Sequence, residues 1–237
     1  MLIQQADFPI AAALFAGAFL SIYFKKLTIS AAIIGFFCGF IIYIAAGYTA
    51  LFCMAAFFIC GTLATARGRK AKQSIEKPDD HTQRKYSQVL ANAGAAAIFA
   101  SLILVFPAHY QVFSIMLAAS LASATSDTLS SELGMLYGKT FYNCISWKRE
   151  ERGLDGAVSL EGTLIGLIGA ALIASIYAMG IQLDRTFFII ITAGFAGNLS
   201  DSVFGATLER HNLLNNDWVN FLSTLFAAAI AGLIYLI

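Results

Sequence analysis

Acidic side chains recur at the ends of long apolar runs. Asp127 and Glu132 close one such run, in ASATSDTLSSELG at 122–134, and Asp201 closes another, in GNLSDSVFGATLE at 197–209. An acid within a membrane span costs about 2.5–3.5 kcal/mol on insertion scales, so it normally has a partner and a function. Carboxylates at one depth repel each other unless they are protonated or share a cation, and Mg²⁺ prefers such oxygen ligands. These residues therefore indicate a polar, cation-binding site, provided that the spans bring them to one membrane face.

The composition shows which elements must position these acids. Hydrophobic residues make up 59% of the 237 residues and charged residues only 12%, whereas a soluble domain carries about 25% charged residues. The mean hydropathy is +0.74. We therefore expect an all-α fold, a polytopic transmembrane helical bundle, in a single integral-membrane domain over residues 1–237. Within it, 1–66 holds three apolar spans, and 67–237 holds the candidate catalytic half.

Eight spans are expected, with seven as the alternative. They lie at 8–24, 28–45, 48–66, 89–106, 111–129, 157–179, 186–204 and 218–237. With eight spans, every Lys and Arg except Arg185 falls in connections on one side. Because basic residues mark the cytoplasmic side, we expect the acids to face the cytoplasm and both termini to lie outside, in a plasma or inner membrane. No basic stretch precedes the first span, so no cleavable signal peptide is expected.

Two hairpins of spans resemble each other. SDT at 126–128 recurs as SDS at 200–202, and VSLEGTL at 158–164 is similar to VNFLSTL at 219–225. The two copies run in the same direction, so they predict a parallel repeat; chance matches between Ser- and Leu-rich segments are the alternative. Such a repeat would bring the two aspartates to one depth, with their carboxylates within about 8–10 Å if they share a metal ion or a metal pair.

A second group of polar residues opens the fourth span. Arg84, Gln88 and Asn92 recur every four residues, which puts them on one face of a helix. A guanidinium followed by two amides can bind a phosphate and a polar headgroup, although hydrogen bonding between helices explains the pattern equally well. Lys70 and Lys72 add positive charge in the preceding connection.

Two glycine-containing segments bear on the same site. GLDGAVSLEGT at 153–163 opens a helix, and its free N–H groups could bind an anion, but it lacks the G-K-[ST] ending of a P-loop. Glu132 lies about 140° around an ideal helix from Asp127. Both acids could therefore reach one ligand only if the helix broke, and Gly134 and Gly138 make such a break plausible.

Several blocks of the sequence resemble a known family. The blocks SDTLSSELG, GLDGAVSLEGT and GNLSDSVFGATLE, together with QVLAN at 88–92, resemble the integral-membrane domain-of-unknown-function 92 family, whose plant member is a phytyl-phosphate kinase. More distantly, Asp127, Glu132 and the SLEGT segment look like phytol and dolichol kinases, which use CTP and resemble CDP-diacylglycerol synthases. The basic residue that precedes S-x-E-G-T in phytol kinases is Val158 here, so another cation must meet the nucleotide phosphates.

The resemblance implies that CTP phosphorylates a prenyl or phytyl monophosphate at the cytoplasmic surface. The implied partners are Mg²⁺, a nucleoside triphosphate, an isoprenoid phosphate and membrane lipids, and no nucleic acid is expected. The candidate catalytic residues are Asp127, Glu132, Asp155 and Asp201, of which Asp127, Asp155 and Asp201 would hold the metal. The candidate nucleotide- and phosphate-binding residues are Lys70, Lys72, Arg84, Gln88, Asn92, Ser131, Lys139, Gly156, Ser159, Glu161, Gly162, Thr163, Asn198, Ser202 and Asn220.

Two alternatives stay open. A CTP-dependent cytidylyltransferase acting on a lipid phosphate would share this site and differ only in its product. A cation-coupled transporter would also use acids within spans, but it needs them near the midplane, where both sides can reach them. Because the acids are expected at one membrane edge, and the first three spans carry almost no ionisable groups, a one-sided enzyme is favoured.

Overall fold

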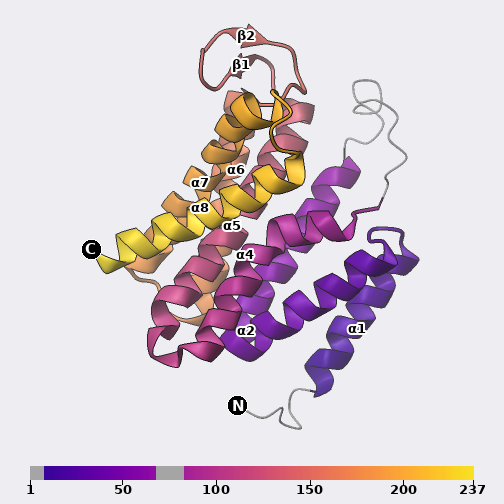
Figure 1. Cartoon of the computed structure of the whole chain (residues 1–237), viewed down its shortest axis with the longest axis vertical. Helices are drawn as coiled ribbons and strands as arrows, with labels where there is room; N and C mark the ends of the chain where they lie inside the picture. The colour runs from indigo at the N-terminus through magenta and orange to yellow at the C-terminus, as the bar shows by residue number, and fades with distance from the viewer. Residues whose placement is uncertain (1–7, 68–82) are drawn as a thin grey trace.

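The chain folds into a bundle of tilted helices (Figure 1), in a computed structural model that describes residues 8–67 and 83–237. The helices are α1 (Phe8–Tyr23), α2 (Ile29–Arg67), α4 (Tyr86–Val105), α5 (Tyr110–Tyr137), α6 (Leu160–Gly180), α7 (Arg185–Phe204) and α8 (Asn216–Leu236). A short 3₁₀ turn, η2 (Pro107–His109), joins α4 to α5. The predicted all-α polytopic bundle is confirmed.

Helix α2 reverses direction in its middle. It has 39 residues, but Gly47 takes the non-helical angles φ 72 and ψ −162. A β-carbon added at Gly39 would lie 3.7 Å from Met54 Sδ, whereas a straight helix would separate these positions by about 22 Å. The two arms correspond to the spans expected at 28–45 and 48–66. With both arms counted, the described residues contain eight apolar helical segments, of which α1, at 16 residues, is shorter than a typical span.

Helix α5 is the centre of the bundle. It contacts α2, α4, α6, α7 and α8, and all residues from 117 to 126 are buried. A helix buried on every face belongs to an interior. Its neighbours approach closely through small side chains, since a β-carbon added at Gly194 would lie 2.6 Å from Ala122 Cβ.

The expected end of the fifth span, at 129, is wrong. Helix α5 continues to Tyr137 without the break expected near Gly134, and Gly138 follows it as the C-cap. The reason is packing, because a β-carbon at Gly134 would lie only 2.9 Å from Gly162 Cα of α6. This glycine admits a neighbouring helix rather than ending its own.

A small sheet between α5 and α6 was not expected. Its strands β1 (Phe141–Asn143), β2 (Arg149–Glu150) and β3 (Ala157–Val158) pair antiparallel in the order β2-β1-β3. The sheet lies at one end of the bundle (Figure 1). Because the strands have only two or three residues, they show no alternation that could reveal them. The sixth span accordingly begins at Leu160 rather than at 157.

A π-helical segment, η3 (Gly205–Glu209), extends α7 toward this sheet. The Arg210 N–H donates to the Gly205 carbonyl over 3.1 Å, which is the wider spacing of a π-helix. Gly156, at φ 75, packs directly on Ala206, where a side chain would not fit. The sheet connection is thereby held against the end of α7.

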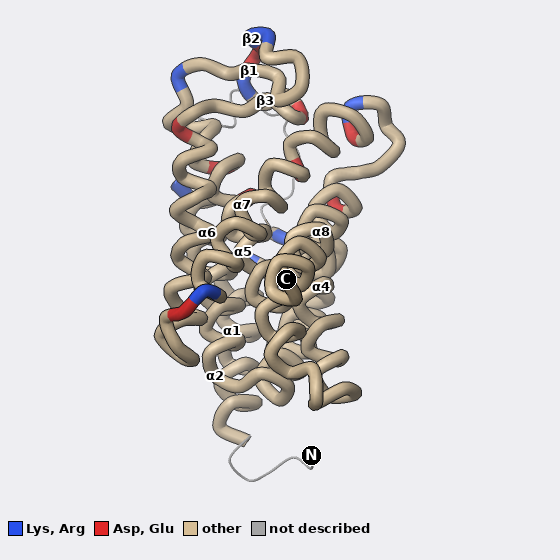
Figure 2. The backbone as a smooth tube through the Cα atoms, turned by 90° about the vertical axis from the view of Figure 1, so that its left-hand side faces the viewer, with Lys and Arg blue, Asp and Glu red and all other residues tan. Residues whose placement is uncertain are grey.

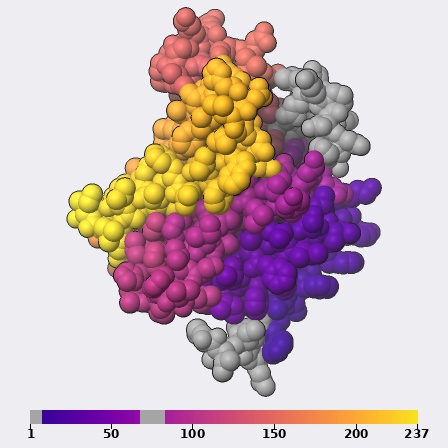
Figure 3. Space-filling model, in the orientation of Figure 1, coloured from indigo at the N-terminus to yellow at the C-terminus, as the bar shows by residue number. Residues whose placement is uncertain are grey.

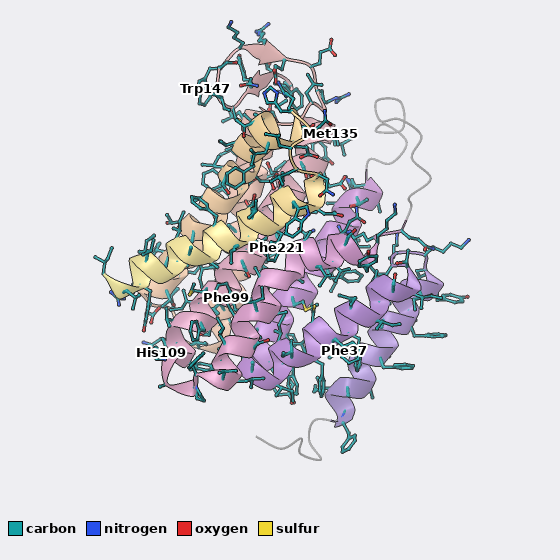
Figure 4. The ribbon with its side chains drawn as sticks, in the orientation of Figure 1. Phe37, Phe99, His109, Met135, Trp147 and Phe221 are labelled. Atoms are coloured by element: carbon teal, nitrogen blue, oxygen red, sulfur yellow. The ribbon has the colours of Figure 1, made fainter. Side chains whose placement is uncertain are left out.

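The two halves of the chain meet along α4. Figure 3 shows α8, orange to yellow, on one side of the magenta α4 and the purple to indigo α1 and α2 on the other. Phe221 of α8 faces α4 (Figure 4), and a β-carbon at Gly94 would lie 3.3 Å from its ring. Helix α4 therefore joins the N-terminal helices to the repeated hairpins α5–α6 and α7–α8.

Candidate functional site

The two aspartates of the repeat meet between α5 and α7. The carboxyl groups of Asp127 and Asp201 lie close enough to interact directly, and the Ser223 hydroxyl of α8 donates to Asp201 Oδ1 over 3.1 Å. Two neighbouring carboxyl groups repel each other when both are ionised, so they need a shared proton or a cation between them. The expected meeting of the two aspartates is confirmed, and three helices contribute to it.

The pair lies inside the bundle rather than at the ends of its helices. A β-carbon added at Gly166 would lie 3.0 Å from Ser126 Oγ, so the residue before Asp127 is level with the seventh residue of α6. This depth is about 9 Å inside the start of α6. The helices continue past the pair, because α5 extends to Tyr137 and η3 extends α7, and the position of the pair relative to the membrane stays a prediction.

Two buried polar groups adjoin the pair on the α6 side. Within the described residues, the fully buried Ser126 Oγ has no hydrogen-bond partner. The amide of Asn198, which is 4% exposed, lies against the same point beside Gly166. Asn198 is thus brought to the aspartate pair as expected, and Ser126 is a neighbour that the list of candidates omitted.

Further acids surround the pair at the sheet end of the molecule, where most of the charged residues gather (Figure 2). Glu209, at the end of η3, lies close enough to Asp155, Asp201 and Asp217 for their charges to act on it. Asp155 and Glu209 also line a cavity of about 560 Å³ together with Trp218. Glu209 was not chosen from the sequence, although the block GNLSDSVFGATLE contains it.

The expected three-carboxylate metal set is not assembled. Within residues 8–67 and 83–237, no three His, Cys, Asp or Glu side chains are placed to hold one metal ion. Asp155 is exposed in the sheet connection, and its backbone carbonyl accepts from Arg210. The aspartate pair remains as a donor set, and Mg²⁺ in phosphoryl-transfer sites is usually bound by one or two carboxylates plus substrate phosphates. The pair fits that pattern, so the Mg²⁺ prediction now rests on Asp127 and Asp201.

Glu132 belongs to a different face of α5. Thr65 Oγ1 of α2 donates to Glu132 Oε1 over 2.8 Å. Since α5 is unbroken, Glu132 stays turned away from Asp127. The exposed Ser131 donates to the Asp127 carbonyl over 2.9 Å, a bond within its own helix. Neither residue is brought to the aspartate pair.

Arg84 precedes α4 instead of lying on it, so the expected helical stripe is wrong. Its N–H donates to the Lys26 carbonyl over 2.9 Å, and its carbonyl accepts from the Thr28 N–H over 3.1 Å. The side chain points into the bundle, because a β-carbon at Gly61 would lie 2.9 Å from Arg84 Nη2 and 3.3 Å from Thr128 Cγ2. The guanidinium therefore lies beside the residue that follows the α5 aspartate. Burial lowers the pKa of Arg84.

The other members of the stripe serve α4 itself. Gln88 Oε1 accepts from the Lys85 N–H over 2.9 Å, which caps the start of the helix. Asn92 Nδ2 donates to the Gln88 carbonyl over 2.9 Å. Lys70 and Lys72 lie outside the described residues.

The start of α6 is occupied by packing contacts. Ser159 is the N-cap, and its Oγ accepts from the Gly162 N–H over 3.1 Å. The Thr163 hydroxyl donates to the Ser159 carbonyl over 2.9 Å, and the Lys139 N–H donates to Glu161 Oε2 over 3.4 Å. Because Gly162 N–H is already bonded and Gly162 itself packs on α5, the expected anion cradle is not open at this residue.

The last two candidates lie on α7 and α8. The Ser202 carbonyl accepts from Cys144 Sγ over 3.2 Å, which ties α7 to the sheet connection. Asn220 is half-buried and lies a full turn inside α8, whereas its counterpart in the repeat, Ser159, caps α6. The repeat therefore holds at the aspartates and differs at the starts of the returning helices.

An ion pair fixes the sheet to η3. Arg210 Nη1 and Nη2 donate to Glu150 Oε1 and Oε2 over 2.7 and 2.8 Å. The hydrogen bonds from Arg210 lower the pKa of Glu150, and the same bonds raise the pKa of Arg210. Arg210 also donates to the Asp155 carbonyl, so the same side chain holds the sheet connection. No sequence signal joined these residues, which are 60 positions apart.

Comparisons with known proteins agree on one family. A family model described as "Integral membrane protein DUF92" matches residues 12–228. An uncharacterized membrane protein of Methanocaldococcus jannaschii is 37% identical over 200 residues, which cover 83% of this chain and 81% of that protein. An uncharacterized membrane protein of Synechocystis is 35% identical over 198 residues, which cover 81% of this chain and 76% of that protein.

A plant protein is also similar. Protein VTE6, chloroplastic, of Arabidopsis thaliana is 30% identical over 204 residues, which cover 83% of this chain but only 61% of the plant protein. No solved structure matches the chain.

Proposed function

We propose, from the premise that this chain belongs to the DUF92 integral-membrane family, that it is a phosphotransferase that converts an isoprenyl or phytyl monophosphate to the diphosphate. The observation that carries the proposal is the close pair of carboxyl groups of Asp127 and Asp201 inside the bundle, with the guanidinium of Arg84 beside the neighbouring Thr128. The resemblance to the phytyl-phosphate kinase and the identity to VTE6 support the choice of acceptor.

The donor is a nucleoside triphosphate, with CTP favoured by the more distant resemblance to phytol and dolichol kinases. Asp127 and Asp201 would hold Mg²⁺ together with the triphosphate. The metal ion, when bound, would neutralise negative charge on the transferring phosphoryl group. The 560 Å³ cavity between Asp155, Glu209 and Trp218 opens at the same end of the bundle and is the proposed entry for the nucleotide.

The reaction needs little covalent participation by the protein. An oxygen of the acceptor monophosphate attacks the γ-phosphorus, the bond from that phosphorus to the β–γ bridging oxygen breaks, and the nucleoside diphosphate leaves with the electron pair. No general base is required, because the attacking oxygen is already an anion. Positioning and charge are the main contributions of such sites. Arg84 would hold the acceptor phosphate, and Ser223 would orient Asp201 through their 3.1 Å hydrogen bond.

We place this chemistry on the cytoplasmic side. The sheet end carries the basic connections between α5 and α6 and between α7 and α8, whereas the opposite end carries Asp184 and Arg185 between α6 and α7. Excess Lys and Arg mark cytoplasmic connections. Cytoplasmic nucleotides would then have direct access to the acids.

A cation-coupled transporter is the second candidate, because the aspartate pair lies about 9 Å inside the helices rather than at their edge. Acids at depth that share a cation suit ion pathways. This candidate predicts cation flux into liposomes that requires Asp127 and Asp201, without any nucleotide.

One labelling experiment separates the candidates. Purified protein is incubated with Mg²⁺, an isoprenyl monophosphate, and CTP labelled at either the γ- or the α-phosphorus, with ATP, GTP and UTP in parallel. The proposal predicts γ-label in an isoprenyl diphosphate, identified by mass. Label from the α-position would indicate cytidylyl transfer, and the absence of label in any product, together with cation flux, would favour the transporter.

A further inference from the structure

An apolar cavity of about 450 Å³ lies between α1, α2 and α4. Its wall is formed mainly by apolar side chains from both arms of α2, among them Phe36, Leu51 and Phe58. The volume falls within the range of roughly 300–1,000 Å³ that is typical of sites for small ligands. Two glycines on its wall, Gly17 and Gly35, would have no atom within 4 Å of an added β-carbon, so the helices here leave space.

Ser21, Arg84 and Gln88 are the polar side chains among the described residues that line this cavity, and Arg84 is the charged one. The Ser21 hydroxyl donates to the Gly17 carbonyl over 2.7 Å, and Gln88 Oε1 is bonded to the Lys85 N–H. Within the part of the chain that the structure describes, the Arg84 guanidinium makes no ion pair or side-chain hydrogen bond. Its contact is the face of the Phe57 ring, 5.9 Å from the ring centroid.

A guanidinium in this position favours an anion. Arginine stays protonated in proteins, so the charge must be compensated rather than removed. A buried charge without a partner is costly, and the planar fork of donors matches phosphate oxygens. The backbone bonds to Lys26 and Thr28 hold Arg84 in place, so the donors are presented at a fixed point.

The part of the cavity that Arg84 lines is close to the aspartates. Gly61 of α2 separates the Arg84 guanidinium from Thr128 of α5, and Thr128 is the next residue after Asp127. An anion bound by Arg84 would therefore lie close to the aspartate pair, while anything attached to that anion could extend into the apolar cavity.

We propose that this cavity binds the hydrocarbon chain of a single-chain isoprenoid phosphate, with Arg84 binding its phosphate at the mouth. The assignment rests on the proposed phosphotransferase function and adds where the acceptor lies. One cavity with one charged end suits one chain and one phosphate, whereas a bilayer phospholipid has two acyl chains to accommodate. Because nothing lies within 4 Å of a β-carbon added at Gly35, a larger side chain there would fill part of the space proposed for the hydrocarbon chain.

Binding tests this without relying on catalysis. The protein is reconstituted in phosphatidylcholine nanodiscs with a C20 isoprenyl monophosphate that carries a diazirine at the far end of its chain, and the crosslinked peptides are mapped. We expect crosslinks to α1 and to the arms of α2. Gly35→Phe should weaken binding of the C20 probe at least tenfold and leave a C5 isoprenyl monophosphate within about twofold, because only the long chain reaches the filled space.

Ile33→Phe is the matched control, because Ile33 is on the same arm of α2 but 51% exposed. It should change neither affinity by more than about twofold. Arg84→Gln should weaken binding of the isoprenyl monophosphate but not of the corresponding isoprenol.

Three results would overturn the assignment: crosslinks on α6 to α8, no effect of Gly35→Phe on the C20 probe, or equal competition by diacyl phosphatidate, which would indicate a bilayer lipid site. If the crosslinks and the Gly35→Phe effect are found but no nucleotide supports turnover, the proposed function fails and the binding site stands.

Discussion

The repeated hairpins and the wall of the N-terminal cavity are packed in opposite ways. In the hairpins α5–α6 and α7–α8, glycines meet their neighbours at the limit of contact, with an added β-carbon 2.6 Å from Ala122 at Gly194 and 2.9 Å from the α6 backbone at Gly134. In α1 and α2, Gly17 and Gly35 face open space. Tight packing holds polar groups in one arrangement, whereas open space can admit a ligand.

The hairpins and the N-terminal cavity also differ in the charged groups that they contain. The hairpins contain the aspartate pair, with Glu209 close by, while the cavity of the N-terminal half contains a single guanidinium. The two kinds of group approach each other where Gly61 meets Thr128. The difference teaches that phosphate chemistry and hydrocarbon binding are assigned to separate parts of the molecule, which approach each other beside Gly61.

Removing a carboxylate should have the largest effect. Asp127→Asn and Asp201→Asn should each lower turnover at least about 10²-fold, the typical loss for one electrostatic group in an active site. Glu151→Gln is the matched acid-to-amide control, because Glu151 is exposed in the sheet connection. Steady-state turnover at saturating Mg²⁺ is the measurement. Activity near wild type in both aspartate variants would show that the aspartate pair of the hairpins is not part of the catalytic site.

A larger side chain at a glycine should reduce the stability of the protein more in the hairpins than at the wall of the N-terminal cavity. Gly194→Leu should destabilise the protein by about 1–3 kcal/mol, the usual cost of overpacking, because α5 leaves no room beside Gly194. Gly17→Leu adds the same side chain where nothing lies within 4 Å and should leave thermal stability nearly unchanged. Equal shifts in the midpoint of thermal unfolding, measured in the same detergent, would mean that the two regions are packed alike.

Only part of this contrast could be predicted from the sequence. Apolar runs and the positions of Lys and Arg predicted the spans, including the two arms of α2, and the SDT and SDS echo predicted that Asp127 meets Asp201. Those signals are local or repeated. By contrast, Arg84 is placed by backbone bonds to Lys26 and Thr28, far away in the chain, so periodicity put it on a helix that begins two residues later.

The same limit applies at the sheet end. The strands are too short to alternate, and Glu150 meets Arg210 across 60 residues. The continuation of α5 past Gly134 was also missed, because glycines that admit a neighbouring helix look in sequence like glycines that end one. Gly134 illustrates this, since it packs on α6 while α5 continues to Tyr137.

The ion pair on the sheet should give the smallest effect. Because Arg210 lowers the pKa of Glu150 in the folded protein, the pair contributes stability above the ordinary carboxyl pKa of about 4.3 and loses it as the pH falls through the lowered value. Glu150→Gln should therefore cost below about 1 kcal/mol at neutral pH. The difference from wild type should disappear at acid pH in thermal unfolding; a difference independent of pH would assign Glu150 a role in packing only.

The most direct test of the whole account is the distance between the metal and the acceptor. Mn²⁺ replaces Mg²⁺ in the protein with an isoprenyl monophosphate and a non-hydrolysable triphosphate, and the ³¹P relaxation of the monophosphate is recorded. The account predicts strong paramagnetic relaxation in wild type and in Glu151→Gln, and its loss in both Asp127→Asn and Asp201→Asn. Relaxation that persists unchanged in both aspartate variants would show that the metal and the acceptor meet elsewhere, and it would contradict the account.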